Sequence, residues 1–110
     1  MKLLDNPVKS PADKKNYRAV ELDNGLRCLL ISQETDDKVA SAVSMVVEAG
    51  SMHEPRGIAG LAHFCEHLLF MGTEKYPDEN TFDNFVSKFG GYSNASTHDG
   101  FTRYHVSFLI

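Results

Sequence analysis

The alternation of apolar and polar residues predicts a β-hairpin at each end of the chain. Residues 17–32 form the first hairpin, with Asp23-Asn24-Gly25 as a tight turn. The second hairpin covers residues 92–110 and turns at His98-Asp99-Gly100. Its last strand, residues 101–110, is expected to present an open apolar edge through which copies of the chain could self-associate.

The segment between the hairpins predicts one strand and then two helices. Residues 39–48 alternate with small or apolar residues on both faces, which is typical of a strand buried inside a sheet. Helical periodicity covers residues 58–70, ended by Gly72, and residues 81–89. The aromatic residues expected in the core are Phe82, Phe85, Phe89, Phe101 and Phe108.

Strands and helices are segregated along the chain, which predicts an α+β fold with the helices packed on one face of a mainly antiparallel sheet. Residues 1–16 are charged and proline-containing and are expected to be an extended leader. Residues 17–110 would then be one incomplete domain. Because Phe108-Leu109-Ile110 lies within a predicted strand, we expect the chain to be the first part of a larger domain.

Composition excludes several classes of protein. A net charge of −4 disfavours binding to nucleic acids or anionic membranes. No apolar run approaches the ~18 residues of a membrane span. Two cysteines cannot build a disulfide framework, and Met1-Lys2-Leu3-Leu4-Asp5-Asn6 becomes polar too early for a signal peptide. These features indicate a reducing intracellular compartment, the cytoplasm.

The segment with candidate chemistry is the first predicted helix. At 100° per residue, His63, Glu66 and His67 share an arc of about 100°. The opposite arc is apolar and includes Cys65, which is therefore expected to be a small buried core residue. The composition would produce His-x-x-Glu-His about 0.014 times per chain by chance.

This spacing suits a zinc-dependent hydrolase. Side chains four residues apart on a helix are neighbours, so two imidazoles can bind one ion. Zinc with an open position acidifies its bound water, and a nearby carboxylate can act as the general base. We therefore expect His63 and His67 to bind zinc and Glu66 to be the base.

His-x-x-Glu-His is the inverted zinc motif of the inverzincins. The surrounding sequence closely resembles the insulin-degrading enzyme and pitrilysin family of zinc peptidases. The resemblance begins at about residue 17 and rests on Gly50-Ser51, Glu54, residues 57–73, Lys75-Tyr76-Pro77 and residues 90–95.

The resemblance implies an endopeptidase that hydrolyses short or unfolded polypeptides with one Zn²⁺ per complete active site. It implies His63 and His67 as ligands and Glu66 as the catalytic base. Ser93, Asn94 and Ala95 resemble the family's edge strand, to which an extended substrate adds. The third ligand, a glutamate, would lie beyond Ile110, so we expect no turnover from this chain without the missing remainder of its parent.

Other interpretations stay open at this level. The chain could be a non-catalytic fragment, or a degenerate relative that packs against a partner. Glu66→Gln distinguishes this hypothesis from an enzyme, because only the enzyme needs the carboxylate. A purely structural zinc would need four protein ligands, of which two are evident. Glu54 is expected to anchor the loop before the helix through hydrogen bonds. The remaining histidines, His53, His98 and His105, are expected to be surface residues and not ligands.

Overall fold

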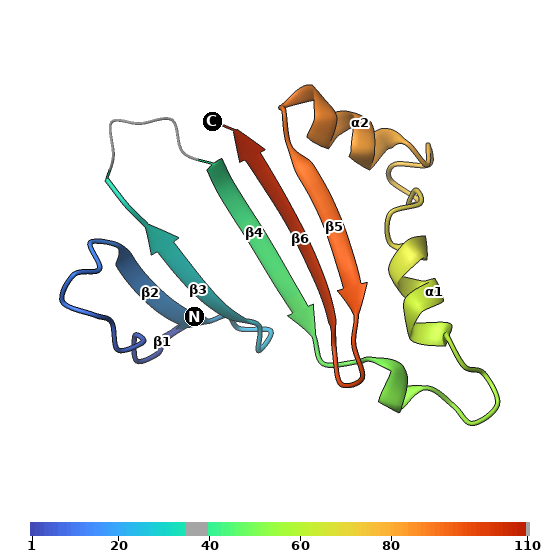
Figure 1. The fold of residues 1–110 in the computed structure, drawn as a ribbon, viewed down its shortest axis with the longest axis horizontal. Helices are drawn as coiled ribbons and strands as arrows, with labels where there is room; N and C mark the ends of the chain where they lie inside the picture. Colours follow the sequence, from blue (N-terminus) through green and yellow to red (C-terminus); the bar gives the residue numbers. More distant parts are fainter. Residues whose placement is uncertain (35–39, 110) are drawn as a thin grey trace. The chain divides into compact units, whose positions relative to one another are not determined.

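A computed structural model describes residues 1–34 and 40–109 of the chain, with the backbone alone described at Leu109 (Figure 1). The chain divides into two compact units, residues 1–37 and 38–110, and each is described by itself below. The predicted boundary between a leader and a domain after residue 16 remains a prediction. Val39, at the start of a predicted strand, and Ile110, at the end of another, lie outside the described residues.

The first unit is a three-stranded antiparallel sheet in the order β1-β2-β3. Its strands are β1 (Lys2–Leu3), β2 (Asn16–Glu21) and β3 (Arg27–Ser32). The β2–β3 pairing confirms the first hairpin, and Gly25 adopts a φ of 84° in its turn. Among the described residues of this unit, Val20 on β2 is the hydrophobic residue that is buried.

The segment predicted as a leader contributes part of this sheet. Lys2 pairs with Glu21 and Leu3 with Val20, and the Leu4 N–H donates to the carbonyl of Ala19. These bonds are made by the backbone, and two residues are too few to show a strand's period in the sequence. The pattern of side chains therefore gave no sign of this strand.

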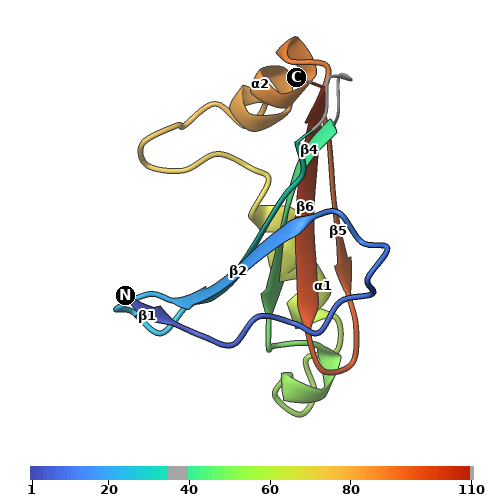
Figure 2. The ribbon, with the colours of Figure 1, turned by 90° about the vertical axis from the view of Figure 1, so that its left-hand side faces the viewer.

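The second unit contains a three-stranded antiparallel sheet in the order β4-β6-β5 and two α-helices. Its elements are β4 (Ala40–Val47), a short 3₁₀ helix η1 (Ser51–His53), α1 (Leu61–Leu68), α2 (Thr81–Lys88), β5 (Tyr92–Thr97) and β6 (Thr102–Leu109). Both helices contact β5, and Figure 2 shows α2 and the segment before it to one side of the sheet. The α+β class is confirmed, with the strands divided between two sheets.

The position of β6 corrects the predicted open edge. β6 is the central strand, paired with β4 on one side and β5 on the other, so residues 102–109 do not form an edge. Among the described residues, the edges of this sheet are β4 and β5. The prediction of burial is also wrong for residues 40–48: all of them are exposed, including Val43 at 65%. Apolar side chains on both faces indicate a strand that suits burial, but they do not supply the elements that would cover it.

The helices lie close to their predicted positions. α2 starts at Thr81 as predicted and ends at Lys88, one residue early. α1 starts at Leu61, three residues later than predicted, because Gly60 precedes it with a left-handed φ of 87°. An apolar residue such as Ile58 extends the helical pattern, but it cannot extend the helix through that backbone geometry.

The predicted aromatic core is largely wrong. Val86 on α2 is buried, whereas Phe82, Phe85 and Phe89 on the same helix face are about half exposed. Phe101 is also exposed and Phe108 is partly buried. Periodicity identifies the face of a helix that favours burial, but the burial depends on a second element. No helix in residues 1–34 and 40–109 has the length and apolar character needed to span a membrane.

Gly50 allows the loop after β4 to approach the β5–β6 turn, and this contact gives a test of the fold. A Cβ at this position would lie 2.7 Å from both the Asp99 carbonyl oxygen and the Phe101 nitrogen, which are backbone atoms. We expect Gly50→Ala to lower the free energy of unfolding by about 1–3 kcal/mol in urea titrations. Gly100→Ala is the control, because a Cβ there meets nothing within 4 Å. Equal stability of the two variants would contradict this packing.

Candidate active site

A glutamate side chain fixes the start of α1. The Glu54 carboxylate accepts hydrogen bonds from the backbone N–H groups of Gly60 and Ala62, both at 2.9 Å. The first N–H groups of a helix have no partner within the helix, and the positive end of its dipole favours an anion. The structure thus confirms the anchoring role expected of Glu54.

The two histidines of the motif lie one turn apart on α1, with their ring nitrogens directed at each other. The Nε2 atoms of His63 and His67 are 3.1 Å apart, and the rings meet nearly edge to face at 86°. Two nitrogens bound to one tetrahedral zinc ion at 2.0–2.1 Å would be about 3.3 Å apart. A proton shared between the rings gives a similar distance. The pair therefore fits a shared cation as well as a shared proton.

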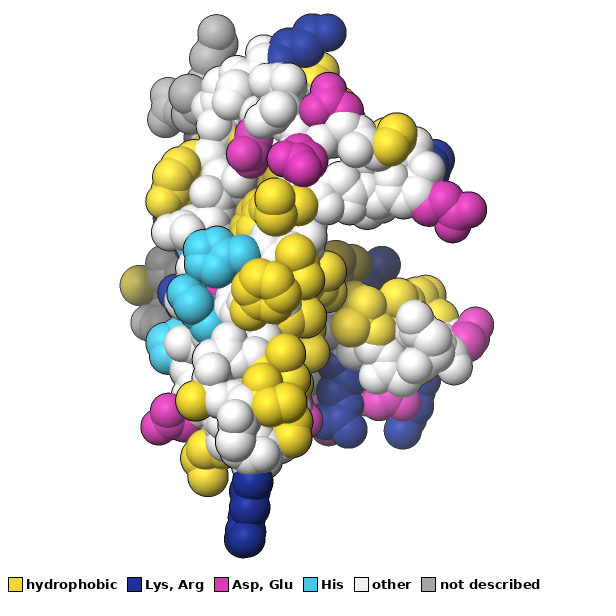
Figure 3. All heavy atoms as spheres, turned by 90° about the vertical axis from the view of Figure 1, so that its right-hand side faces the viewer, with side chains coloured by type: hydrophobic (Ala, Val, Ile, Leu, Met, Phe, Trp, Pro, Cys, Tyr) yellow, Lys and Arg dark blue, Asp and Glu magenta, His cyan; other side chains and the backbone are white. Residues whose placement is uncertain are grey.

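This pair alone does not make a complete metal site. Within the described part of the chain, no group of three or more His, Cys, Asp and Glu residues is arranged to hold a metal ion. The His63 side chain is 63% exposed, so additional ligands can approach it from outside. Figure 3 shows histidine side chains gathered on an open surface beside apolar side chains of the helical layer.

Glu66 occupies the most enclosed position on α1. Its exposed fraction is 7%, and its Oε2 accepts a 2.5 Å hydrogen bond from the Thr97 hydroxyl at the end of β5. The same oxygen lies 3.6 Å from Nδ1 of His63. The sequence correctly grouped Glu66 with the histidines, but this side of the helix contacts the sheet and does not face away from it.

The apolar side of α1 is correspondingly open. Phe64 is 59% exposed, Leu69 just after the helix is 62% exposed, and Cys65 is exposed. The prediction of a buried Cys65 is therefore wrong. An amphipathic sequence determines which residues share a face, but the contact with β5 determines which face is enclosed.

The predicted substrate strand lies at a sheet edge. Ser93, Asn94 and Ala95 belong to β5, which pairs with β6 and has no second strand partner among the described residues. The Ala95 N–H donates to the Asn94 side-chain oxygen at 2.9 Å. Because this N–H is satisfied by a side chain and not by β6, it lies on the open side of β5.

The other histidines differ in their surroundings. His53 accepts a hydrogen bond from the Gly50 N–H, and His98 stacks on Phe101 at a centroid distance of 4.5 Å. Both are exposed, as expected. The prediction for His105 is wrong: it lies partly buried on the central strand, and its buried Nδ1 has no hydrogen-bond partner in the described structure.

Two residues near Glu66 could not be found from the sequence. Thr97 is 31 positions from Glu66, and no motif spacing links a strand-end threonine to a helix carboxylate. Burial raises the pKa of Tyr104 above its usual value, and the charges of Cys65 and Glu66 raise it further. Tyr104 is therefore a neutral phenol at neutral pH.

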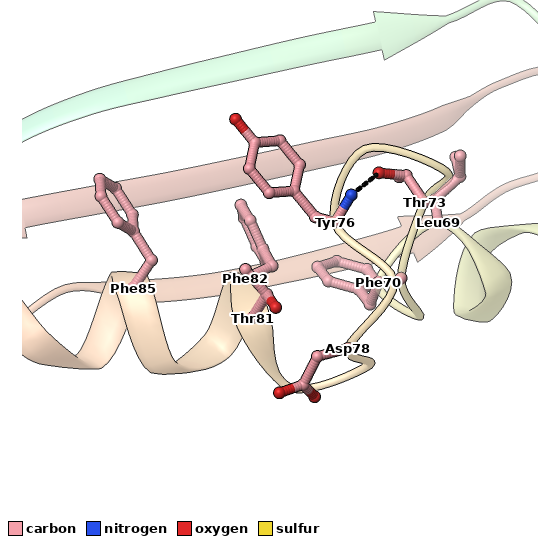
Figure 4. Close-up of a pocket in the computed structure, with 9 residues that line it drawn as sticks. Leu69, Phe70, Thr73, Tyr76, Asp78, Thr81, Phe82 and Phe85 are labelled. Carbon is pink, nitrogen blue, oxygen red and sulfur yellow. Dashed lines mark hydrogen bonds between the residues drawn. The ribbon is translucent and has the colours of Figure 1, made fainter.

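A cavity of about 450 Å³ lies between the end of α1 and α2, outside the histidine pair. Figure 4 shows Phe70, Phe82 and Phe85 among its lining residues, with Asp78 at its margin. The Tyr76 N–H donates to the Thr73 hydroxyl and orders the connecting loop. The walls are mostly apolar and carry no pair of groups suited to acid–base chemistry.

Comparisons with known proteins bear on the whole second unit. Residues 29–110 match the model of the family described as Insulinase (Peptidase family M16). Insulin-degrading enzyme of Drosophila melanogaster is 50% identical over 102 residues, 93% of this chain and 10% of that protein. A Schizosaccharomyces pombe protein whose name includes the words zinc protease is 42% identical over 103 residues, 94% of this chain and 10% of that protein.

The structure is also similar to a solved one. The crystal structure of pitrilysin superposes with a TM-score of 0.83 and 31% sequence identity, covering 99% of this chain and 12% of that chain. The chain spans about a tenth of the length of the curated relatives it matches.

The Glu54 cap gives a test of how α1 is held. Glu54→Ala removes the acceptor for two N–H groups at the helix start, and we expect it to lower the free energy of unfolding by about 1 kcal/mol. Thermal unfolding followed by circular dichroism measures this. Glu74→Ala, which removes an exposed glutamate from the loop after α1, should leave stability nearly unchanged. A Glu54→Ala variant as stable as the wild type would show that the cap contributes nothing.

Proposed function

Because this chain belongs to the insulinase family of peptidases, family M16, we propose that it supplies the catalytic base and two zinc ligands of a zinc-dependent endopeptidase. The substrates would be peptides or small unfolded polypeptides. The observation that carries the proposal is the arrangement on α1: two imidazole nitrogens 3.1 Å apart beside an enclosed carboxylate. The proposal includes the cytoplasm as the compartment, since two cysteines are too few for a disulfide framework.

His63 and His67 are the residues that would hold the zinc ion through their Nε2 atoms. The described residues supply no third ligand, and by resemblance to the family we expect it to be a glutamate outside residues 1–110. When bound, zinc polarises the scissile carbonyl and lowers the pKa of a bound water. The chain alone is therefore expected to lack peptidase activity.

Glu66 would act as the general base. Its carboxylate takes a proton from the attacking water and later delivers it to the leaving amine nitrogen. The position beside His63 supports this role, because the carboxylate is held next to one proposed ligand. Tyr104, protonated at neutral pH, cannot replace it as a base.

Ser93, Asn94 and Ala95 would bind the substrate backbone. β5 is an edge strand, and an extended peptide can add to such an edge through main-chain hydrogen bonds. These bonds do not depend on the substrate's side chains, so they suit a peptidase with broad sequence tolerance. The Ala95 N–H, which donates to the Asn94 side chain in this structure, would donate to the substrate backbone instead.

A second candidate function is a non-catalytic one, in which the chain packs against a partner. The observation that favours it is the exposed apolar surface of α1 and α2, including Phe64 and Phe85. The partner would be the remainder of the parent polypeptide, or a second copy joined along β5, which has no second strand partner among the described residues. This function and the peptidase function differ in whether the Glu66 carboxylate is required.

Zinc content tests the ligand pair. In the intact protein, we expect about one zinc ion per active site after dialysis against metal-free buffer, measured by plasma mass spectrometry. His67→Ala should lose nearly all of it, because one imidazole is removed from the proposed site. His98→Ala is the control, since that ring stacks on Phe101 elsewhere in the unit. Full zinc content in His67→Ala would contradict the ligand assignment.

Substitution of the base tests catalysis separately from zinc binding. Glu66→Gln in the intact protein keeps the size of the side chain but removes its capacity to accept a proton. We expect peptide hydrolysis to fall by at least about 10²-fold, with zinc content retained. A quenched fluorescent peptide measures the rate, and Glu74→Gln is the matched control. Unchanged hydrolysis in Glu66→Gln would contradict the role of Glu66 as the base.

A further inference from the structure

The hydrogen bond between Thr97 and Glu66 joins β5 to α1. The Thr97 hydroxyl donates to Oε2 of Glu66 at 2.5 Å, although the two residues are 31 positions apart in the chain. Glu66 is 7% exposed, and Thr97 is partly buried. A hydrogen bond to a carboxylate in such an enclosed place is of the stronger, charge-assisted kind.

This bond leaves the two carboxylate oxygens of Glu66 in different situations. Oε2 accepts the bond from Thr97 and faces Nδ1 of His63 at 3.6 Å. Oε1 accepts no protein hydrogen bond within the described part of the chain. A glutamate side chain has several rotatable bonds, so an unheld carboxylate would occupy several rotamers. Holding Oε2 selects one of them and leaves Oε1 available to a water.

The end of β5 that carries Thr97 is itself firmly held. Thr97 is paired with Thr102, whose hydroxyl donates to the carbonyl of Ala49 at 2.8 Å and which is 5% exposed. The adjoining turn accepts backbone hydrogen bonds from Ser51 and Met52. The Thr97 hydroxyl thus projects from a fixed point of the sheet.

The same strand contains the proposed substrate-binding residues. Ala95 and Thr97 are two positions apart on β5, so their side chains lie on the same face of the strand. One strand would therefore set the position of the substrate backbone and, through Thr97, the position of the base. Such a link favours a fixed distance between the substrate backbone and the Glu66 carboxylate.

We propose that Thr97 is a positioning residue that holds the Glu66 carboxylate in its proton-accepting orientation; this rests on the proposed peptidase function. Thr97 touches neither metal nor substrate in this role and acts only through Glu66. The alternative is a structural contact that keeps α1 on the sheet. A structural contact would affect stability, whereas a positioning contact affects the rate of the chemical step.

The test compares three variants of the intact protein with the wild type in steady-state peptide hydrolysis. Thr97→Val keeps the shape but removes the hydroxyl, and we expect kcat to fall roughly 10- to 100-fold with KM and zinc content unchanged. Thr97→Ser restores the hydroxyl and should recover most of kcat. Thr73→Val makes the same change at a hydroxyl in the loop after α1, outside the link between β5 and Glu66, and should leave kcat close to the wild-type value.

A structure of the Thr97→Val protein gives a readout that does not depend on activity. We expect the Glu66 carboxylate to move to another rotamer while the backbone of α1 stays in place. An unmoved carboxylate, or a wild-type kcat in Thr97→Val, would overturn the inference.

Failure of the inference can be distinguished from failure of the proposed function. If Glu66→Gln is inactive while Thr97→Val retains the wild-type kcat, only the positioning role is wrong. If the wild-type protein hydrolyses no peptide, or if Glu66→Gln remains fully active, the proposed function fails and the role of Thr97 fails with it.

Discussion

The orientation of α1 depends on the enclosure of one carboxylate, that of Glu66, against the end of β5. A carboxylate removed from water is costly unless hydrogen bonds replace its hydration. Thr97 provides such a bond, and His63 lies within reach of the same oxygen. With Glu66 turned toward β5, helical geometry places His63 and His67 on the adjoining flank, where their ring nitrogens converge at an exposed surface.

The same orientation leaves the apolar side of α1 open. Phe64, Leu68 and Leu69 are each about half exposed, and a similar surface lies at Phe85 on α2 and Phe89 just after it. Among the described residues, Val20 and Val86 are the hydrophobic residues that are buried. Isolated soluble domains seldom present apolar surface on this scale, so the helical layer is suited to contact with other polypeptide. The proposed site lies beside this surface and not within it.

The sequence was most informative where local geometry alone fixes the outcome. The two hairpins follow from alternating side chains around Asp23-Asn24-Gly25 and His98-Asp99-Gly100, and the helix at 81–88 follows from its 3.6-residue period. The grouping of His63, Glu66 and His67 also follows from that period, since it requires only that the segment be helical. The start of α1 was misplaced because Gly60 adopts a left-handed conformation that apolar periodicity does not encode.

The sequence by itself thus determined the elements, the α+β class and the cluster of two imidazoles and one carboxylate on a helix. Tertiary structure decided which strand is central, which face of α1 is enclosed and which hydroxyl meets Glu66. β6 is central because β4, far back in the chain, pairs with it, and Thr97 reaches Glu66 because β5 returns alongside α1. Such contacts join residues tens of positions apart. Their existence depends on how the elements pack, which a local pattern of side chains does not specify.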